Sequence, residues 1–311
     1  MINRVPHFTI LFFLLYISCL AQSQHSNFVI KEPLFNEVSL LRNIKTLSSD
    51  SFEGRRTGTR GAVKAKKYII NEFNALNVKP LGRNFEQPFS FLSKGKSYQG
   101  VNVLGLVKGS CCTDSYIVIS AHYDHEGIKR GKIYNGADDD ASGVSALFGI
   151  AEYFKNHPPK HSVILAAFDG EELGLKGSKY FVDNSIVPRK QIMLNLNLDM
   201  ISRSDKNELF AVGTRYSKTL EQIILKGGYS NKIKLLTGHD GSNWKDDWTD
   251  ASDHESFHKK GIPFIYFGVE DHKDYHQPTD DFENIQPEFY IEAVNIIISV
   301  FNKVDALQIK R

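Results

Sequence analysis

Hydrophobic positions along the chain recur with two different periods, and together they predict an alternation of helices and strands. Apolar residues spaced three and four apart indicate amphipathic helices. The predicted helices cover residues 37–47, 62–76, 142–154, 175–184, 217–226, 253–260 and 287–305. Residues 48–61 and 235–249 are polar and irregular, which is typical of loops.

Short apolar or β-branched runs predict the strands. These runs cover residues 85–91, 100–107, 115–121, 161–168, 208–212 and 262–267. Runs that are apolar throughout, such as 115–121 (SYIVISA), are typical of buried central strands. Residues 191–200 (QIMLNLNLDM) instead alternate apolar and polar side chains, which predicts a half-buried strand.

The order of these elements predicts the fold class. Strands alternate with helices along most of the chain, and no linker-like stretch divides residues 27–311. This pattern favours an α/β fold. We therefore predict a single domain over residues 27–311, with a central mixed, largely parallel, twisted β-sheet flanked by helices on both faces.

Polar residues that can bind metals follow three of the predicted strands. His122 ends the run 115–121, Glu171 and Glu172 come just after 161–168, and Asp199 lies near the end of 191–200. In open α/β sheets, sites form just beyond the carboxyl ends of the strands. Histidine and carboxylate ligands without thiolate suit zinc, and manganese or cobalt stay open as alternatives.

Two loops bring further candidate ligands to the same region. One carries three consecutive aspartates, Asp138 to Asp140, and the other carries His272, Tyr275 and His276. Several carboxylates cannot be buried together without compensating positive charge. Two divalent cations supply four positive charges, and one carboxylate can bridge two metals about 3.5–4 Å apart. The sequence therefore predicts a two-metal site.

Six sequence motifs occur in a fixed order that resembles a known family. They are SAHYDH (120–125), YNGADDDASG (134–143), FDGEELGLKGS (168–178), LNLDM (196–200), SDHESF with GIP (252–263) and YHQPTDD (275–281). The chain resembles the co-catalytic zinc exopeptidases, which include bacterial leucyl aminopeptidases, aminopeptidase Y and the glutamate carboxypeptidase relatives. The resemblance covers most of residues 27–311.

The resemblance implies a role for each matching residue. His122 and Asp199 would hold one zinc ion, Glu172 and His276 would hold the other, and Asp139 would bridge both. The implied cofactor is therefore two Zn²⁺ ions per chain.

The same resemblance implies the catalytic residues. Glu171 would be the general base, and Asp124 would orient the imidazole of the ligand His122. Tyr275 matches a tyrosine that some members of the family use to polarise the scissile carbonyl.

The remaining polar residues of the motifs have simpler interpretations. We expect Asp140 to cap the following helix, Asp138 to be exposed, and Asp280 and Asp281 to stabilise the loop around His276. Asp253 is expected to be a structural support. The histidines expected to be exposed or supporting, rather than ligands, are His125, His254, His258 and His272.

Composition and charge exclude some functions. The chain has 311 residues, of which 41% are hydrophobic, and its net charge is only +2. It lacks the basic patch or stripe that a nucleic-acid-binding protein shows. The adjacent Cys111 and Cys112 lack the spacing of a zinc-thiolate site.

The N-terminal residues predict export. Arg4 precedes an apolar run at 8–20, and Ala21 follows it. This pattern is typical of a secretory signal peptide, here residues 1–21, and the run is too short for a comfortable membrane span. An uncleaved anchor or a lipidated Cys19 are the alternatives. We expect a secreted or periplasmic protein with no stable membrane span after cleavage.

The sequence thus predicts a zinc-dependent exopeptidase that acts on peptides, and the scarcity of Lys and Arg in the motifs favours an aminopeptidase. The alternatives are a single-zinc glutaminyl cyclase of the same fold and a non-catalytic, receptor-like binding relative. Residues 235–250 and 267–274 are the expected walls of the substrate pocket. Side-chain preference and oligomeric state stay open.

Overall fold

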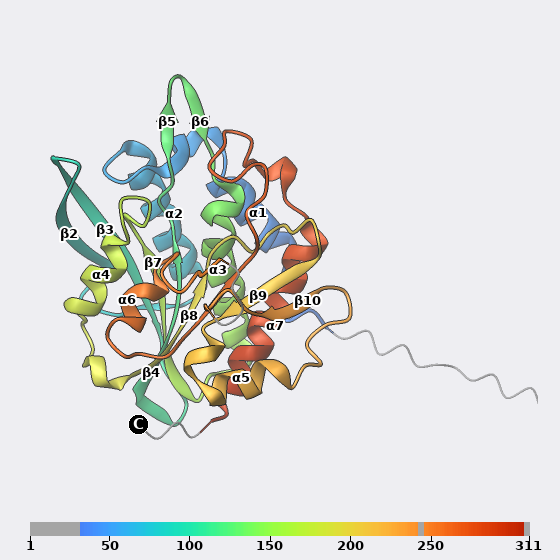
Figure 1. Cartoon of the computed structure of the whole chain (residues 1–311). Coiled ribbons are helices and arrows are strands. Elements are labelled where there is room, and N and C mark those ends of the chain that lie inside the picture. The colour runs from blue at the N-terminus through green and yellow to red at the C-terminus, as the bar shows by residue number, and fades with distance from the viewer. Residues whose placement is uncertain (1–31, 242–245, 308–311) are drawn as a thin grey trace, which may run out of the picture. The chain divides into compact units, whose positions relative to one another are not determined.

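A mixed β-sheet of nine strands runs through the computed structural model, which describes residues 32–241 and 246–307 (Figure 1). The predicted signal peptide 1–21, with Cys19, lies outside these described residues. Eight strands lie side by side in the order β1 (Lys79–Pro80), β3 (Lys96–Val107), β7 (His161–Phe168), β4 (Cys112–His122), β8 (Ile192–Leu198), β11 (Phe264–Gly268), β9 (Glu208–Val212) and β10 (Lys234–Thr237). The ninth strand, β2 (Glu86–Ser93), pairs with β3.

The four central strands are parallel to one another. β4 pairs in parallel with β7 and with β8, and β8 pairs in parallel with β11. Their carboxyl ends therefore lie along one edge of the sheet. The outer strands make the sheet mixed, because β3 is antiparallel to β7 and β9 is antiparallel to β11.

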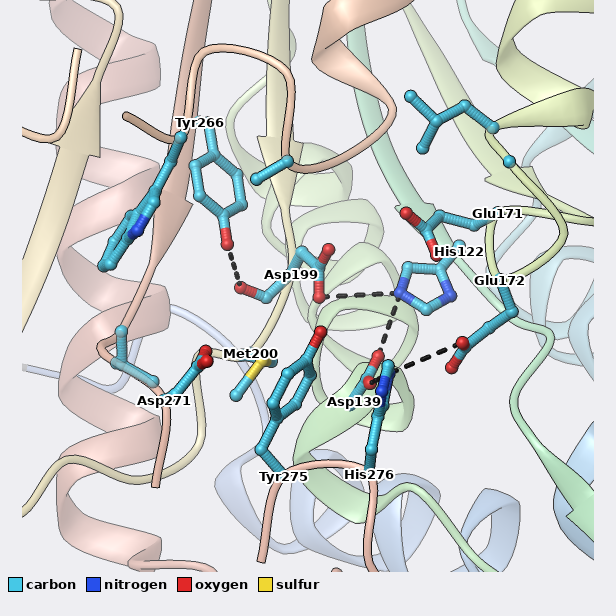
Figure 2. A pocket seen from close by; sticks show the side chains of 15 residues that line it. His122, Asp139, Glu171, Glu172, Asp199, Met200, Tyr266, Asp271, Tyr275 and His276 are labelled. Atoms are coloured by element: carbon cyan, nitrogen blue, oxygen red, sulfur yellow. Dashed lines mark hydrogen bonds and ion pairs between the residues drawn. The ribbon is translucent and has the colours of Figure 1, made fainter. Parts of the chain in front are cut away.

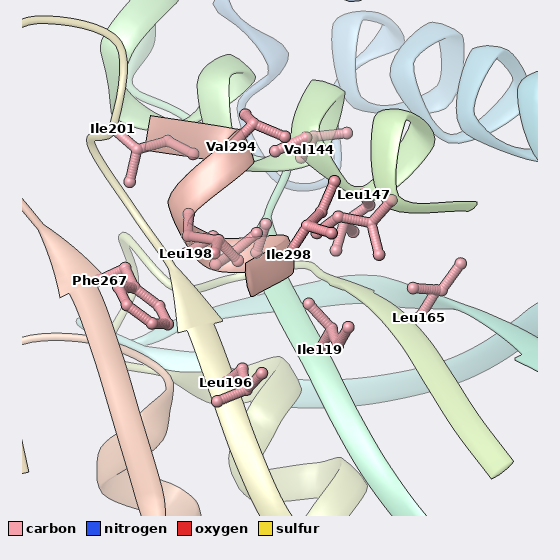
Figure 3. Close-up of a cluster of buried hydrophobic side chains, with 14 of the residues drawn as sticks. Ile119, Val144, Leu147, Leu165, Leu196, Leu198, Ile201, Phe267, Val294 and Ile298 are labelled. Carbon is pink, nitrogen blue, oxygen red and sulfur yellow. The ribbon is translucent and has the colours of Figure 1, made fainter. Parts of the chain in front are cut away.

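Helices cover both faces of the sheet. One face carries α1 (Glu37–Leu47), α2 (Arg60–Ala75), α3 (Gly143–Asn156), α5 (Lys218–Leu225) and α7 (Pro287–Asp305), and the other carries α4 (Lys176–Asp183) and α6 (His254–His258). Successive side chains of β4 point to opposite faces of the sheet. Ile119 packs in the larger cluster beneath α3 and α7 (Figure 3), and Val118 packs with Phe181 and Phe257 of α4 and α6.

The predicted fold class is confirmed: the described chain is one α/β domain with a mixed, largely parallel sheet between helices. All the predicted helices and strands occur, with ends shifted by a few residues. Two predicted loops contain short regular segments, a 3₁₀ helix at Asp50–Arg55 and the strand β10. A hairpin of β5 (Gly127–Lys129) and β6 (Lys132–Tyr134) was not predicted.

One prediction about burial is wrong. β8 is buried along its whole length and not half-buried. Its polar side chains have partners inside the protein: Asn197 accepts a hydrogen bond from Ser120 and donates one to Ser252, and Asn195 donates one to Ser120. Alternation of Leu and Asn therefore separates two buried faces here, one of which is polar. Among the described helices, none combines the length and apolar character needed to cross a membrane.

Candidate metal centre

The carboxyl ends of the central strands bring the predicted ligands together (Figure 2). His122 is the last residue of β4, Asp199 directly follows β8, and Glu172 lies four residues beyond β7. Because these strands are parallel neighbours, side chains separated by up to 77 positions in the sequence meet at one edge. The segment Ala137–Ser142 delivers Asp139 between them, and the loop after β11 delivers His276.

Hydrogen bonds hold the aspartate loop in a fixed shape. The carboxylate of Asp280 accepts from the backbone N–H groups of Asp138 and Asp139, and Asp140 accepts from Gly143 N at 2.8 Å. Asp140 therefore meets the start of α3 as expected. Asp280 secures the aspartate loop, whereas the prediction placed its effect at the loop around His276.

The prediction that Asp138 is exposed is wrong. Its side chain is fully buried and accepts hydrogen bonds from the backbone and hydroxyl of Ser202, both at 2.7 Å. Its second carboxylate oxygen lies 3.0 Å from Nε2 of His272. Three consecutive aspartates would usually be exposed to solvent, but here each carboxylate contacts a different buried group: Ser202 for Asp138, His122 for Asp139 and the backbone N–H of Gly143 for Asp140.

The first group of candidate ligands is His122, Asp139 and Asp199. Nε2 of His122 lies 3.1 Å from Oδ1 of Asp139 and 3.5 Å from Oδ1 of Asp199 (Figure 2). All three side chains are buried. Their nitrogen and oxygen atoms converge on a common point, as the donors of a metal ion do.

The second group surrounds Glu172. Nε2 of His276 lies 3.1 Å from Oδ2 of Asp139 and 3.4 Å from Oε2 of Glu172. Since Asp139 directs Oδ1 to the first group and Oδ2 to the second, it joins the two. His125, Asp139 and Glu172 also lie close enough together to hold an ion.

The residues present fit a pair of divalent cations. Their donors are imidazole nitrogens and carboxylate oxygens, which suit zinc. Oε1 of Glu172 and Nδ1 of His125 are buried without a hydrogen-bond partner among the described residues, so positive charge at this point would satisfy them.

The electrostatics of the site support this fit. Burial opposes the charged form of His276, but Asp139 and Glu172 outweigh it and raise the pKa of His276 to about 10. Burial and Asp139 disfavour the ionised Glu172, yet His125 and His276 lower its pKa to about 2. The imidazole of His276 therefore holds a proton that a metal ion must displace, and metal affinity should fall as the pH falls.

Asp124 supports the site through a different contact from the one expected. Nδ1 of His122 lies 3.0 Å from the backbone oxygen of Asp124, whose carboxylate is farther away at 3.8 Å. The carboxylate instead accepts from the backbone N–H of Glu171 at 3.0 Å and from the hydroxyl of Thr57. Asp124 thus links the loop of His122 to the loop of Glu171.

A cavity of about 420 Å³ opens beside the candidate ligands. Glu171 lines it, and burial raises the pKa of Glu171 well above its usual value, with Asp199 and Asp253 adding to the effect and His122 opposing it. Tyr275 lines it as well and stacks on the ring of His276, with centroids 4.0 Å apart (Figure 2). A carboxyl group with a raised pKa beside a cavity can exchange protons with a substrate.

The cavity also includes residues that were not predicted individually. Trp248, Val269 and Asp271 come from the two stretches expected to form the pocket, while Leu175, Met200 and Tyr266 were not anticipated. Leu175 and Met200 lie within the motifs FDGEELGLKGS and LNLDM, but nothing in those motifs marks them as pocket residues, and the other four residues belong to no motif.

The other histidines differ from one another. His272 supports Asp138. His254 is buried and stacks against the rings of Phe264 and Tyr266, and its Nε2 lies within hydrogen-bond distance of the backbone oxygen of Trp248, at 2.8 Å. His125 is fully buried against Glu172, so it is not exposed, and this contact is compatible with the supporting role that was expected.

Comparison with known sequences places this arrangement in a family. The sequence pattern of peptidase family M28 matches residues 102–301, which is more than half of the chain. The chain belongs to peptidase family M28. It is 29% identical over 219 residues to the aminopeptidase YwaD of Bacillus subtilis, a match that covers 63% of this M28 chain and 43% of that relative. The chain spans less than half the length of curated relatives that it matches.

Solved structures share the fold of this M28 chain. A glutaminyl cyclase from Porphyromonas gingivalis has a TM-score of 0.71 and 17% identity, and the match covers 88% of this chain and 99% of that one. A zinc aminopeptidase from Bacillus subtilis has a TM-score of 0.68 and 18% identity, with 88% and 96% covered. At these identities the likeness establishes the fold alone.

Proposed function

We propose that this M28 chain is a zinc-dependent aminopeptidase with two zinc ions. The observation that carries the proposal is the pair of ligand groups joined by Asp139 on the wall of a cavity that Glu171 also lines. His122 and Asp199 would hold one ion, and Glu172 and His276 the other. Bound zinc supplies Lewis acidity toward the attacking water and the scissile carbonyl.

The protein groups then move the protons. Glu171 accepts a proton from the attacking water as its oxygen bonds to the carbonyl carbon, and returns it to the amine when the C–N bond breaks. The raised pKa of Glu171 suits both steps. Tyr275 donates a hydrogen bond from its hydroxyl to the carbonyl oxygen, where negative charge develops.

The charge of the cavity favours substrates with a free amine. Among the described residues that line it, five are acidic and none is Lys or Arg. Asp271 lies outside both candidate ligand groups, so its carboxylate is available to accept the α-ammonium group of a peptide. A terminal carboxylate would instead find no Lys or Arg to pair with among the described lining residues. This asymmetry supports an aminopeptidase over a carboxypeptidase.

The apolar part of the cavity suggests the preferred first residue. Leu175, Met200, Trp248 and Val269 line it beside the acidic groups. Side chains of this kind favour an apolar partner, because burying apolar surface releases about 25 cal/mol per Å². We therefore propose peptides with an apolar N-terminal residue as substrates.

A second candidate is a glutaminyl cyclase. The structural match to the enzyme from Porphyromonas gingivalis covers 99% of that chain, so this M28 chain spans the whole of that fold. Such an activity would act on an N-terminal glutamine and use one zinc ion. Zinc content and a glutamine-initiated peptide therefore distinguish the two candidates.

The test uses aminoacyl-nitroanilides, their N-blocked forms and a glutamine-initiated peptide. We expect chelator-sensitive hydrolysis of the free-amine substrates only, with two zinc ions per chain. Glu171→Ala should keep near-normal zinc and lose at least about a hundredfold in rate, while Glu288→Gln on the exposed first turn of α7 should change neither. Cyclisation without hydrolysis would favour the cyclase, and full activity of Glu171→Ala would refute the assigned base.

We also propose that residues 27–311 form the catalytic domain and that residues 1–21 direct its export. An N-terminal sequence of the mature protein beginning after Ala21 would support cleavage, whereas a chain that begins at Met1 would contradict it.

A further inference from the structure

His125 is a buried imidazole beside the second group of candidate ligands. It lies three residues beyond His122, on the loop that leaves β4, and its side chain is fully buried. The backbone around it leaves no room to move, because a Cβ on Gly136 would lie 2.6 Å from its ring. The position of this imidazole is therefore set by the same loop that delivers Asp139.

The contacts of His125 resemble those of a ligand more than those of a hydrogen-bonding support. Its Nδ1 lies 2.8 Å from Oε1 of Glu172 and 3.6 Å from Oδ2 of Asp139. Neither Nδ1 of His125 nor Oε1 of Glu172 has a correctly directed hydrogen-bond partner among the described residues. The two atoms attract each other as an ion pair at this distance, but neither has a directed hydrogen bond, and a cation between them would satisfy both.

The distances match the geometry of a single ion. Donors about 2.0–2.1 Å from a tetrahedral zinc lie roughly 3.3 Å from one another. The contacts of His125 with the two carboxylates are 2.8 and 3.6 Å, and those of His276 with the same carboxylates are 3.1 and 3.4 Å. Both imidazoles therefore approach Asp139 and Glu172 at distances that bracket this value.

We propose that Nδ1 of His125 is a direct ligand of the ion held by Glu172, which rests on the proposed zinc-dependent function. His125, Asp139 and Glu172 lie close enough together to hold an ion, and His276 contacts the same two carboxylates. This position would then have four protein donors, where the other has three, from His122, Asp139 and Asp199. Four protein ligands close a tetrahedral zinc site, whereas three leave a position for water or substrate.

The asymmetry assigns different tasks to the two positions. An ion held by His122, Asp139 and Asp199 would keep a position open to substrate, and a chelator should remove it first. The ion on Glu172 is held more tightly and organises the site.

Zinc binding to chelator-treated protein, measured in competition with a chromophoric chelator, tests the proposal. We expect two ions of unequal affinity in the unmodified protein. His125→Ala should weaken the tighter one at least about tenfold. His125→Gln, which keeps a hydrogen-bond donor but is a poor zinc ligand, should weaken it equally. His161→Ala removes a buried histidine at the opposite edge of the sheet and should change neither affinity.

Diffraction from zinc-loaded crystals gives a readout that does not depend on the variants. A distance of about 2.0–2.3 Å between Nδ1 of His125 and a zinc ion supports the proposal. A distance beyond about 3 Å, or normal affinity in His125→Gln, overturns it and makes His125 a positioning residue for Glu172. Failure of the unmodified protein to bind zinc would instead refute the proposed function.

Discussion

Arg55 offers a direct test of how the site is held together. It belongs to the segment Asp50–Arg55, its side chain is 1% exposed, and it lies directly behind the metal-binding loops. Its guanidinium donates to the backbone oxygens of Tyr123 and Gly136 at 2.9 Å, and also to those of Leu47 and Asn135. One cation therefore joins the loop of His122 to the loop of Asp139.

The expected loss follows from these contacts. Arg55→Met keeps the length of the side chain but removes every donor, leaving four backbone oxygens without this partner. Each hydrogen bond from a charged donor contributes about 1.5–3 kcal/mol. Because the buried guanidinium itself costs several kcal/mol to desolvate, we expect a net loss of about 3–5 kcal/mol.

Urea denaturation of the metal-free protein measures this loss. The free energy of unfolding of Arg55→Lys should lie between those of the unmodified protein and Arg55→Met, since a single ammonium group cannot match the planar fork of the guanidinium. Arg60→Met is the control, because the side chain of Arg60 is 84% exposed and its ion pair with Glu53 contributes less than about 1 kcal/mol. An Arg55→Met protein within about 1 kcal/mol of the unmodified one would refute the reasoning.

Three other results are expected. Asp271→Asn should raise KM for free-amine substrates about tenfold with little effect on kcat. The substitution removes the attraction between the carboxylate and the ammonium group, and a tenfold change corresponds to about 1.4 kcal/mol of binding free energy. Tyr275→Phe should lower kcat at least about tenfold with zinc content unchanged. His254 has its pKa lowered to about 4 by burial, so the unfolded chain takes up its proton first as the pH falls. Folding stability should therefore decrease by up to about 3 kcal/mol between pH 6.5 and 4.

Matched variants check each of these results. Asp114→Asn changes an exposed carboxylate of β4 and should leave KM unaltered. An unchanged KM in Asp271→Asn would show that the ammonium group binds elsewhere. For Tyr275, a normal kcat in the phenylalanine variant would remove its assigned role. His254→Asn should flatten the acid-dependent part of the stability curve, and an equally steep curve would assign that dependence to other groups.

Local patterns were sufficient for the elements and for most candidate ligands. The helix α7 and the strand β7 begin and end at the predicted residues. A helix that buries one stripe needs apolar residues at helical spacing, and a strand that is buried on both faces needs a continuous apolar run. Candidate ligands such as His122 and Asp199 were recognisable because they lie at the ends of apolar strands, where α/β folds form their sites.

The errors have a common physical cause. The Asn residues of β8 and the carboxylate of Asp138 were assigned to solvent because polar residues are usually solvated. Each is buried with partners from distant segments, such as Ser252 for Asn197 and Ser202 for Asp138. Partners more than fifty residues away leave no periodicity in the sequence.

The sequence by itself determined the alternating elements, the α/β class and the kinds of donor atoms available, because these depend on periodicity and residue chemistry. Only the tertiary structure decided which donors converge. The parallel register of β7, β4 and β8 aligns their ends, and the buried loop contacts turn Asp139 toward two groups at once. The same packing places His125 against Glu172, since the direction of a loop side chain is set by what surrounds it.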